Sequence, residues 1–458
     1  MSEHTLDESP LTGFHKKLAV YSSGGPFLDG YVLSIVGLAL VQMTPQLGFD
    51  AVQEGLIGAS ALIGIFFGAF LGGWLADRFG REILYTADLI AIILFSGLQF
   101  WANGFWMLFV LRLLIGMAVG ADYPIATSLL AEFTPRRFRG PLLGALMVAW
   151  FVGAAAAYIV GDLVARTGDE GWRWMLASAA VPGVIVLLLR MGTPESPRWL
   201  VRKGRVADAE AVVRSVFGPD ARIDDLPAES DDERVGLSQL WRSGYLGRVV
   251  FVSVFWSCSV IPVFAVYAFG PKILGGLGMT GGLANMGSAL IAVLFVVGCI
   301  VAVLVVNRIG RRALLAQSFL FSGIALLALG LFPDAGVAVL LSLFSAYAVL
   351  IGGAQVLQFI YPNELFPTDI RGSAVGLSSS LSRIGAAVGT YLVPLALVHF
   401  GIGATMLAAA GVTLAGFVVS VVWAPETRSL SLAEAAALSP GRRRGVSGER
   451  PEAAASTP

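Results

Sequence analysis

Gly72-Gly73-Trp74-Leu75-Ala76-Asp77-Arg78-Phe79-Gly80-Arg81 is a short polar stretch between two long apolar runs. Its charged end, residues 77–81, returns 230 residues later as Asn307-Arg308-Ile309-Gly310-Arg311. The second copy also stands between two apolar runs, so both copies occupy equivalent places in the chain. This recurrence indicates that the chain holds two related units.

Two further charged motifs recur at nearly the same spacing. Three motifs at nearly one offset make chance a poor explanation, and they predict a duplicated membrane unit. The recurring pairs are Glu132 and Arg139 with Glu364 and Arg371, where the two glutamates are 232 residues apart, and Pro194-Glu195 with Pro425-Glu426, 231 residues apart.

The composition is typical of a protein whose solvent is the lipid bilayer. Of the 458 residues, 56% are hydrophobic and only 14% are charged, whereas a soluble domain carries about 25% charged residues. The net charge is zero, which gives no indication of a nucleic-acid partner. Cys258 and Cys299 both lie in apolar runs, where we expect packing residues rather than a disulfide or a metal site.

Twelve apolar runs approach the length of about 20 residues that a helix needs to cross a bilayer. We therefore predict an all-α membrane protein with twelve transmembrane helices in two six-helix bundles. The predicted regions are an N-terminus at 1–18, a first bundle at 19–190, a linker with short helices at 191–247, a second bundle at 248–424, and a largely disordered tail at 425–458.

The distribution of basic residues predicts the orientation. With twelve spans, both termini lie on one side, and we place 26 of the 31 Lys and Arg residues on that side. Basic loops stay in the cytoplasm. We therefore expect both termini to be cytoplasmic, in a plasma (inner) membrane.

Four ionisable residues inside the predicted spans stand out: Asp29, Arg112, Asp122 and Arg383. Each costs about 2.5–3.5 kcal/mol to insert, so each is a functional hypothesis. A carboxylate in a low-dielectric site binds a proton more readily than in water, and a nearby arginine opposes this. We interpret Asp29, Arg112 and Asp122 as proton-coupling residues. The alternative is a structural ion pair, or for Asp122 a hydrogen bond near a Pro124 kink.

Residues 15–430 resemble the major facilitator superfamily of transporters. The stretch from Gly72 to Arg81 resembles the signature between its second and third spans. Pro194-Glu195-Ser196-Pro197-Arg198-Trp199-Leu200 resembles the motif after span six of sugar porters and organic ion transporters, and Glu364-Leu365-Phe366-Pro367 with Arg371-Gly372 resembles their motif after span ten. The resemblance implies two bundles that rock around a central site.

The charges of these motifs are predicted to form gates on the side of the termini. Ion pairs among them would hold the bundles together in one state and separate in the other, and a pair near water is worth only about 0–1 kcal/mol. The alternative is that they fix topology and cap helices. The predicted gating residues are Asp77, Arg81, Glu132, Arg139, Glu195, Arg311, Glu364, Arg371 and Glu426.

The resemblance also implies roles for the charges inside the spans. Arg112 precedes Glu132 by the spacing seen in sugar porters, whose arginine pairs with an acid of span one; here Val32 occupies the place of that acid and Asp29 lies one turn earlier. Asp122, in Gly120-Ala121-Asp122-Tyr123-Pro124, matches the proton-transfer acid of phosphate:proton symporters. We expect Arg112 and Asp122 to share a helix face and to lie on one path for the proton.

Arg383 stands where organic anion transporters carry an arginine, so the resemblance implies an anionic ligand. A planar guanidinium can bind two oxygens of a carboxylate or phosphate, although a counter-charge role toward another span is the alternative. The sugar-binding glutamines of spans five and seven are missing, and aromatic residues are available instead. The predicted substrate-binding residues are Arg383, Trp150, Trp256, Tyr267, Gln355, Gln358 and Tyr391.

These observations predict a secondary transporter rather than an enzyme. We expect a proton-coupled symporter of a small organic solute, best an aromatic organic acid, that works as a monomer. Its partners would be that solute, protons and the bilayer, with no cofactor beyond the proton gradient and no metal. Alternatives are a proton-antiport exporter of drugs or metabolites, a sugar or phosphate symporter, and a sensor that does not transport.

Overall fold

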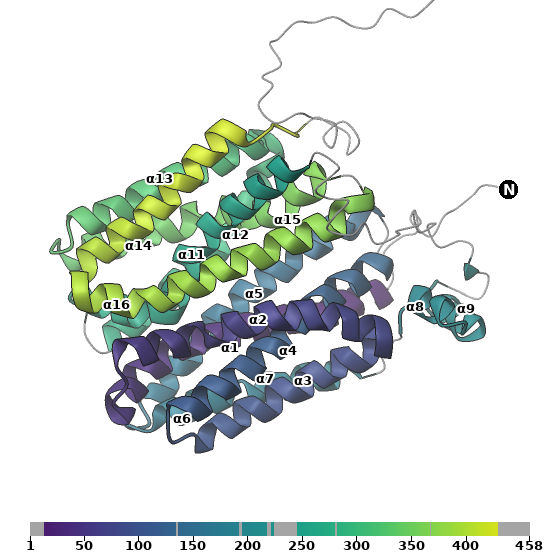
Figure 1. Ribbon diagram of the computed structural model, residues 1–458, viewed down its shortest axis with the longest axis horizontal. Coiled ribbons are helices and arrows are strands. Elements are labelled where there is room, and N and C mark those ends of the chain that lie inside the picture. Colours follow the sequence, from purple (N-terminus) through teal and green to yellow (C-terminus); the bar gives the residue numbers. More distant parts are fainter. Residues whose placement is uncertain are drawn as a thin grey trace, which may run out of the picture.

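The computed structural model describes residues 13–133, 136–191, 195–217, 221–223, 245–279, 282–366 and 368–428. The regular elements within these ranges are all helices, and Figure 1 shows them in two bundles that lie side by side. The first bundle is formed by the early part of the chain and the second by the late part, as the repeated motifs predict.

The first bundle contains six membrane-length segments, of which the last is bent near Ala179. α6 and α7 together form one apolar segment, Gly171–Arg190. The helices are α1 (Gly13–Leu47), α2 (Ala51–Phe79), α3 (Arg81–Leu98), a short 3-10 helix (Gln99–Trp101), α4 (Phe105–Phe133), α5 (Arg136–Ala165), α6 (Gly171–Ser178) and α7 (Ala180–Arg190).

The second bundle repeats this count. α14 and α15 form one apolar segment, and Gly401, with a φ of 78°, breaks α16 into two spans. The prediction of twelve spans is therefore confirmed. The helices are α11 (Leu246–Gly276), α12 (Gly282–Ile309), α13 (Arg311–Leu331), α14 (Val337–Leu350), α15 (Gly352–Leu365) and α16 (Thr368–Trp423).

In the segment of chain that connects the two bundles, two short helices lie beside one end of the molecule (Figure 1). They are α8 (Pro197–Arg202) and α9 (Val206–Phe217), and both lie in the linker for which the sequence predicts short helices. We call the end where α1 begins and α16 ends the terminus side, and the opposite end the far side.

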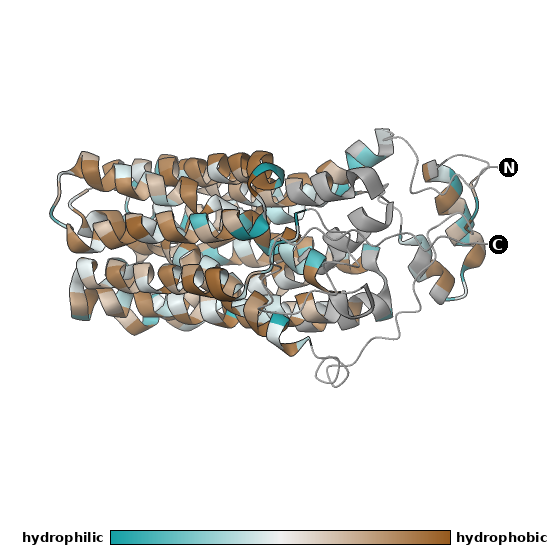
Figure 2. Cartoon of the chain, turned by 90° about the horizontal axis from the view of Figure 1, so that it is seen from above, coloured by the Kyte–Doolittle hydropathy of each residue, from teal (hydrophilic) through white to brown (hydrophobic). Residues whose placement is uncertain are grey.

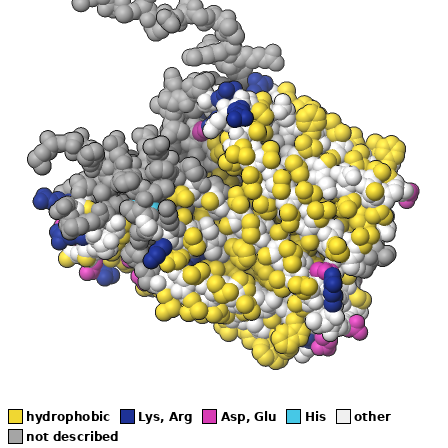
Figure 3. Space-filling view, turned by 180° about the vertical axis from the view of Figure 1, so that it is seen from behind, with side chains coloured by type: hydrophobic (Ala, Val, Ile, Leu, Met, Phe, Trp, Pro, Cys, Tyr) yellow, Lys and Arg dark blue, Asp and Glu magenta, His cyan; other side chains and the backbone are white. Residues whose placement is uncertain are grey.

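The outer surface of the bundles is apolar, as a lipid environment requires. Large side chains such as Leu188, Leu304 and Phe400 are 61%, 69% and 75% exposed. Figure 2 shows hydrophobic residues along the length of the helices, and Figure 3 shows charged side chains mainly toward the two ends of a hydrophobic face.

Small residues bring α1 and α5 into close contact beside Asp29. A Cβ on Gly30 would lie 1.9 Å from the carbonyl oxygen of Trp150, and one on Gly153 would lie 1.9 Å from that of Phe27. Helices in lipid approach most closely where their side chains are smallest. Gly30 and Gly153 therefore fix the depth at which Asp29 enters the first bundle.

The two bundles touch at the far side. α11 is distorted at Phe269, and Pro271 has no N–H to give to the carbonyl of Tyr267. The hydroxyl of Tyr158, from α5 of the other bundle, donates to that carbonyl at 2.7 Å. Nearby, Lys272 of α11 forms a salt bridge with Glu54 of α2, so the far side is closed by contacts between the halves.

Candidate functional site

Asp29 lies near the middle of α1 and is only 5% exposed. Its Oδ1 atom is buried and has no hydrogen-bond partner among the described residues. The carboxylate lies within electrostatic range of Asp122 and Arg190 in its own bundle and of Arg383 in the other. Asp29 thus sits between the charges of both halves.

Arg383 lies near the middle of the first span of α16, the part before the break at Gly401, and is partly exposed. Its guanidinium carbon is 5.4 Å from the centre of the Phe264 ring of α11. Because Arg383 also acts on Asp29, the sequence alternative of a counter-charge to an acid of another span agrees with this arrangement. The same guanidinium is positioned to meet an anion that enters between the bundles.

A second charged group is buried in the first bundle. Asp122 of α4 forms a salt bridge with Arg190 of α7, with 2.9 Å between Oδ1 and Nη1 and with side chains 1% and 3% exposed. The Arg190 guanidinium also stacks on the Tyr85 ring, 3.4 Å from its centre, and donates to the Tyr85 carbonyl at 3.2 Å. Asp88 of α3 lies within electrostatic range of both Asp122 and Arg190.

Sequence reasoning missed Asp88 and Arg190. Asp88 lies within the predicted third span, where it is an intramembrane acid like the others, and this signal was available. Arg190 is the last residue of the predicted sixth span and resembles an ordinary basic residue at a membrane boundary. Only the packing of α7 against α3 turns its side chain inward.

Arg112 does not pair with Asp29, contrary to the expectation from the resemblance. It is 1% exposed, and its Nε donates to the carbonyl of Ile57 on α2 at 3.2 Å. Its two terminal nitrogens have no hydrogen-bond partner within the described ranges. Ten residues separate Arg112 from Asp122, which leaves about 80° between them on the helix wheel, so the two side chains face different neighbours.

The predicted aromatic residues of α5 and α11 do meet. The Trp150 ring lies 5.8 Å from Phe264 and 5.4 Å from Tyr267, both in edge-on contacts. Trp256 instead packs on Phe359 at 6.0 Å within the second bundle. Tyr391 lies against α2 at Gly55, where it belongs to the far-side closure.

Gln355 and Gln358, predicted as substrate-binding residues, are buried and turned toward α11. Each is 3% exposed. The Gln355 amide donates to the carbonyl of Ser259 at 3.0 Å, and the Gln358 amide donates to the hydroxyl of Ser259 at 2.6 Å. In the parts of the chain that the structure describes, no His, Cys, Asp and Glu residues are grouped to hold a metal ion.

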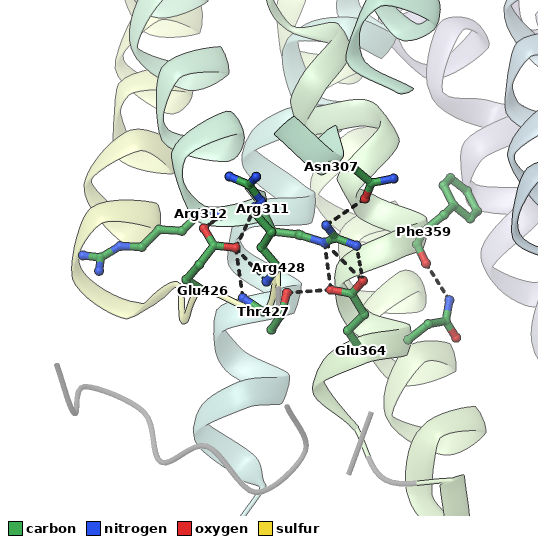
Figure 4. A network of polar contacts seen from close by, with 9 residues as sticks. Asn307, Arg311, Arg312, Phe359, Glu364, Glu426, Thr427 and Arg428 are labelled. Carbon is green, nitrogen blue, oxygen red and sulfur yellow. Dashed lines mark hydrogen bonds and ion pairs between the residues drawn. The ribbon is translucent and has the colours of Figure 1, made fainter. Parts of the chain in front are cut away.

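At the terminus side of the second bundle, Arg311 and Glu364 form the ion pair shown in Figure 4. Arg311 Nη2 lies 2.8 Å from Glu364 Oε1, and Thr427 donates its hydroxyl to Glu364 Oε2 at 2.5 Å. Glu426 accepts the backbone N–H groups of Arg311 and Arg312 at 2.9 and 3.1 Å. Glu426 therefore caps the start of α13.

The first half repeats this cap. Glu195 accepts the backbone N–H of Glu82 at 3.1 Å, at the start of α3. The preceding turn residues, Gly80 and Gly310, have φ values of 107° and 97°, a region that favours glycine. The duplicated motif is thus a helix cap built twice, in agreement with the capping alternative.

The predicted gates across the bundles are not found among the described contacts. The described contacts of Arg311, Glu364 and Glu426 stay within the second half, and the described contact of Glu195 with Glu82 stays within the first. With the far side closed, the bundles meet at the opposite end from these residues. The side chains of Asp77, Arg81, Glu132, Arg139 and Arg371 lie outside the described part of the structure.

Known proteins resemble the chain over nearly its whole length. The profile of the family described as "Sugar (and other) transporter" matches residues 17–438. The "Putative metabolite transport protein YaaU" of Escherichia coli K12 is 44% identical, with 94% of this chain and 96% of the relative covered. The "Glucose transporter GlcP" of Staphylococcus epidermidis is 32% identical, with 90% and 94% covered.

Solved structures share the fold. The xylose transporter XylE from E. coli, in a partially occluded inward open conformation, superposes with a TM-score of 0.78 at 20% identity, covering 92% of this chain and 100% of that one. The predicted two-bundle fold is therefore confirmed, and the relatives are transporters rather than enzymes. The chain is an integral membrane transporter of the major facilitator superfamily and belongs to its sugar (and other) transporter family.

Proposed function

We propose that this transporter is a proton-coupled symporter of a small organic acid and that it works by alternating access. The observation that carries the proposal is the pair of opposite charges at mid-helix depth, Asp29 on one bundle and Arg383 on the other, within electrostatic range of each other. Both belong to the halves that must move relative to one another during transport.

The two charges supply a coupling mechanism. An ionised Asp29 competes with an anionic substrate for the Arg383 guanidinium. A proton on Asp29 removes that competition, so proton and anion bind more tightly together than apart. Such a coupling is reciprocal, and it favours loading and release of both ligands in the same step, which is symport.

The aromatic contacts beside Arg383 favour a flat organic acid. Phe264 lies under the guanidinium, and the Trp150 ring of the other bundle packs edge-on against the Phe264 ring. Aromatic walls with few polar groups suit a ligand that has an apolar body and one charged end. We propose that the carboxylate of the substrate meets Arg383 while its body contacts these rings.

We further propose that the terminus side is cytoplasmic. The basic residues predicted on that side and the rule that they stay in the cytoplasm support this orientation. The far side would then be external, and its closure by Tyr158 and by the Glu54–Lys272 pair would correspond to a state closed toward the outside.

The test begins with a thermal-shift screen of organic acids, sugars and phosphate on the purified protein. Any stabilising compound is then used in proteoliposomes with an imposed proton gradient. Asp162→Asn, a variant of another buried acid, is the matched control for Asp29→Asn. Proton-driven accumulation of an organic acid is the expected result. Accumulation of a neutral solute only, or expulsion of the solute against an inward proton gradient, would overturn the proposal.

A sugar is the second candidate substrate. The "Glucose transporter GlcP" relative supports it, and so do the amides of Gln355 and Gln358, which are hydrogen-bonding groups next to α11. A polyol substrate requires several such groups. In the same screen, stabilisation by hexoses or pentoses without any response to organic acids would favour this candidate.

A further inference from the structure

Glu54 is a buried acid in the first turn of α2, at the far side of the molecule. Its carboxylate forms a salt bridge with the ammonium group of Lys272 on α11, so the partner comes from the other bundle. The two charges are unequally buried, because the Glu54 side chain is 4% exposed and that of Lys272 is 34% exposed. The salt bridges of Asp122 and Glu364, by contrast, stay within one bundle. The Glu54–Lys272 contact therefore depends on the two bundles being together at this side.

Two glycines of α2 show how closely the second bundle covers the Glu54 carboxylate. A Cβ on Gly55 would lie 2.4 Å from the Tyr391 carbonyl oxygen of α16, and one on Gly58 would lie 2.8 Å from the Phe269 ring of α11. Both helices of the second bundle thus pack directly on the backbone of α2 beside Glu54. In such a place water screens a charge poorly, which strengthens an ion pair and makes an unpaired charge costly.

The unequal burial predicts unequal consequences when one partner is lost. Without Lys272, the Glu54 carboxylate stays buried with no counter-charge while the bundles are together, and separation of the bundles relieves it by hydration. Without Glu54, the Lys272 ammonium can turn to water, because its side chain is already partly exposed and has a flexible stem. Removing Lys272 should therefore disfavour the closed far side much more than removing Glu54 does.

We propose that the Glu54–Lys272 salt bridge is an electrostatic latch, which stabilises the closed far side and breaks each time this side opens. The part that the latch plays in the transport cycle rests on the proposed function, whereas its stabilisation of the closed far side does not. The exposed end of Lys272 gives water access to the pair, so hydration can replace the contact as the bundles part.

The accessibility of a single cysteine measures opening of the far side in the full-length protein without any substrate. Thr390 of α16 is buried against α2, with its Cγ2 atom 3.5 Å from a Cβ placed on Gly58. The reporter protein carries Thr390→Cys, and its two native cysteines, Cys258 and Cys299, are replaced by alanine. A water-soluble maleimide should label Thr390→Cys only when the bundles part at this side.

The expected labelling rates follow from the burial of the two charges. Lys272→Met should raise the rate by about tenfold or more, because it leaves the buried Glu54 carboxylate unpaired. Glu54→Gln should raise it only about two- to fivefold, the range of an ion pair near water. Lys272→Arg, which keeps the charge, should leave the rate unchanged. Glu54→Gln combined with Lys272→Met should label more slowly than Lys272→Met alone, because the double variant buries no unpaired charge.

Arg166→Gln is the matched control, since it breaks the Arg166–Asp162 salt bridge at the same side but within the first bundle. Its labelling rate should equal that of the reporter protein. An unchanged rate in Lys272→Met would overturn the latch, and so would a rate in Arg166→Gln as high as that in Lys272→Met. Glu54→Gln leaves no buried charge unpaired and remains informative should Lys272→Met fail to fold, because an unchanged rate in Glu54→Gln would also overturn the latch.

Proton-driven accumulation in proteoliposomes separates the latch from the proposed function. Unchanged accumulation in a variant that is labelled faster would remove the role of the latch in the transport cycle. A protein that shows the expected labelling rates but accumulates no organic acid would remove the proposed function alone.

Discussion

The two bundles share their frame but not their interior charges. Both halves start their third span with a glycine turn and a glutamate cap, at Gly80 with Glu195 and at Gly310 with Glu426. Among the described residues, however, every buried acid lies in the first half. They are Asp29, Glu54, Asp88, Asp122 and Asp162.

This difference shows which parts of a duplicated unit are constrained by architecture and which are free to specialise. A cap is needed wherever a helix begins at the membrane surface, because its first N–H groups have no partner within the helix. Interior acids are needed only where charge or protons must be handled. In the proposed mechanism the first half carries the proton chemistry, and the second half contributes Arg383.

The largest effect is expected from Asp29→Asn. The variant removes the titrating charge between the halves, so proton-driven accumulation should be abolished, while exchange of substrate across proteoliposomes without a gradient should continue. Uptake with and without a proton gradient measures this. Accumulation with an unchanged response to pH would show that the first half does not couple to protons through Asp29.

The buried ion pair of the first half should matter more for stability than that of the second half. Arg190→Gln leaves Asp122 buried without its partner, a loss of about 3–5 kcal/mol. Arg311→Gln breaks a pair whose side chains are 13% and 17% exposed, a loss of about 1.5–3 kcal/mol. Thermal unfolding in detergent compares them, and equal losses would contradict the asymmetry.

Arg383→Ala tests what the second half adds. Loss of a hydrogen-bonded charge at the ligand should weaken binding of an organic acid by about 1.5–3 kcal/mol, or about ten- to a hundredfold. Binding of the corresponding amide should change little. Thermal shifts with the acid and with its amide give the comparison. A similar loss for both ligands would assign Arg383 a structural role.

The smallest effect is expected at the duplicated caps. Glu195→Gln and Glu426→Gln each weaken a cap at a helix start, with an expected cost of about 0.5–2 kcal/mol. Because the two caps have the same geometry, the two costs should be similar. Melting temperatures of the single variants provide the measurement, and a large difference between them would mean that the halves differ at the surface as well.

The fold could be predicted because span length, apolar composition and motif repetition are properties of single stretches of chain. The twelve spans and the α9 helix of the linker follow from such local signals. The repeated glutamates could be found in the same way, although their role as caps became clear only when the turn at Gly80 was seen with its φ of 107°.

The site could be predicted only in part, because partners come from different helices. Asp29, Asp122 and Arg383 were found as charges within spans, but their neighbours depend on helix rotation and packing. The phase of α4 directs Arg112 toward Ile57 instead of Asp29. The packing of α7 brings Arg190 inward, and no spacing along the chain indicates that contact.

The bond from Tyr158 to the Tyr267 carbonyl has a consequence for how the far side can open. Pro271 has removed the donor that an unbroken helix would supply, so the hydroxyl of the opposite bundle satisfies a lone backbone oxygen. When the halves part, that oxygen must be hydrated at once or stay bare at a cost of about 1–3 kcal/mol. Water must therefore reach the Tyr267 carbonyl as soon as the bundles begin to separate. An opening that excludes water is disfavoured from the start of the separation.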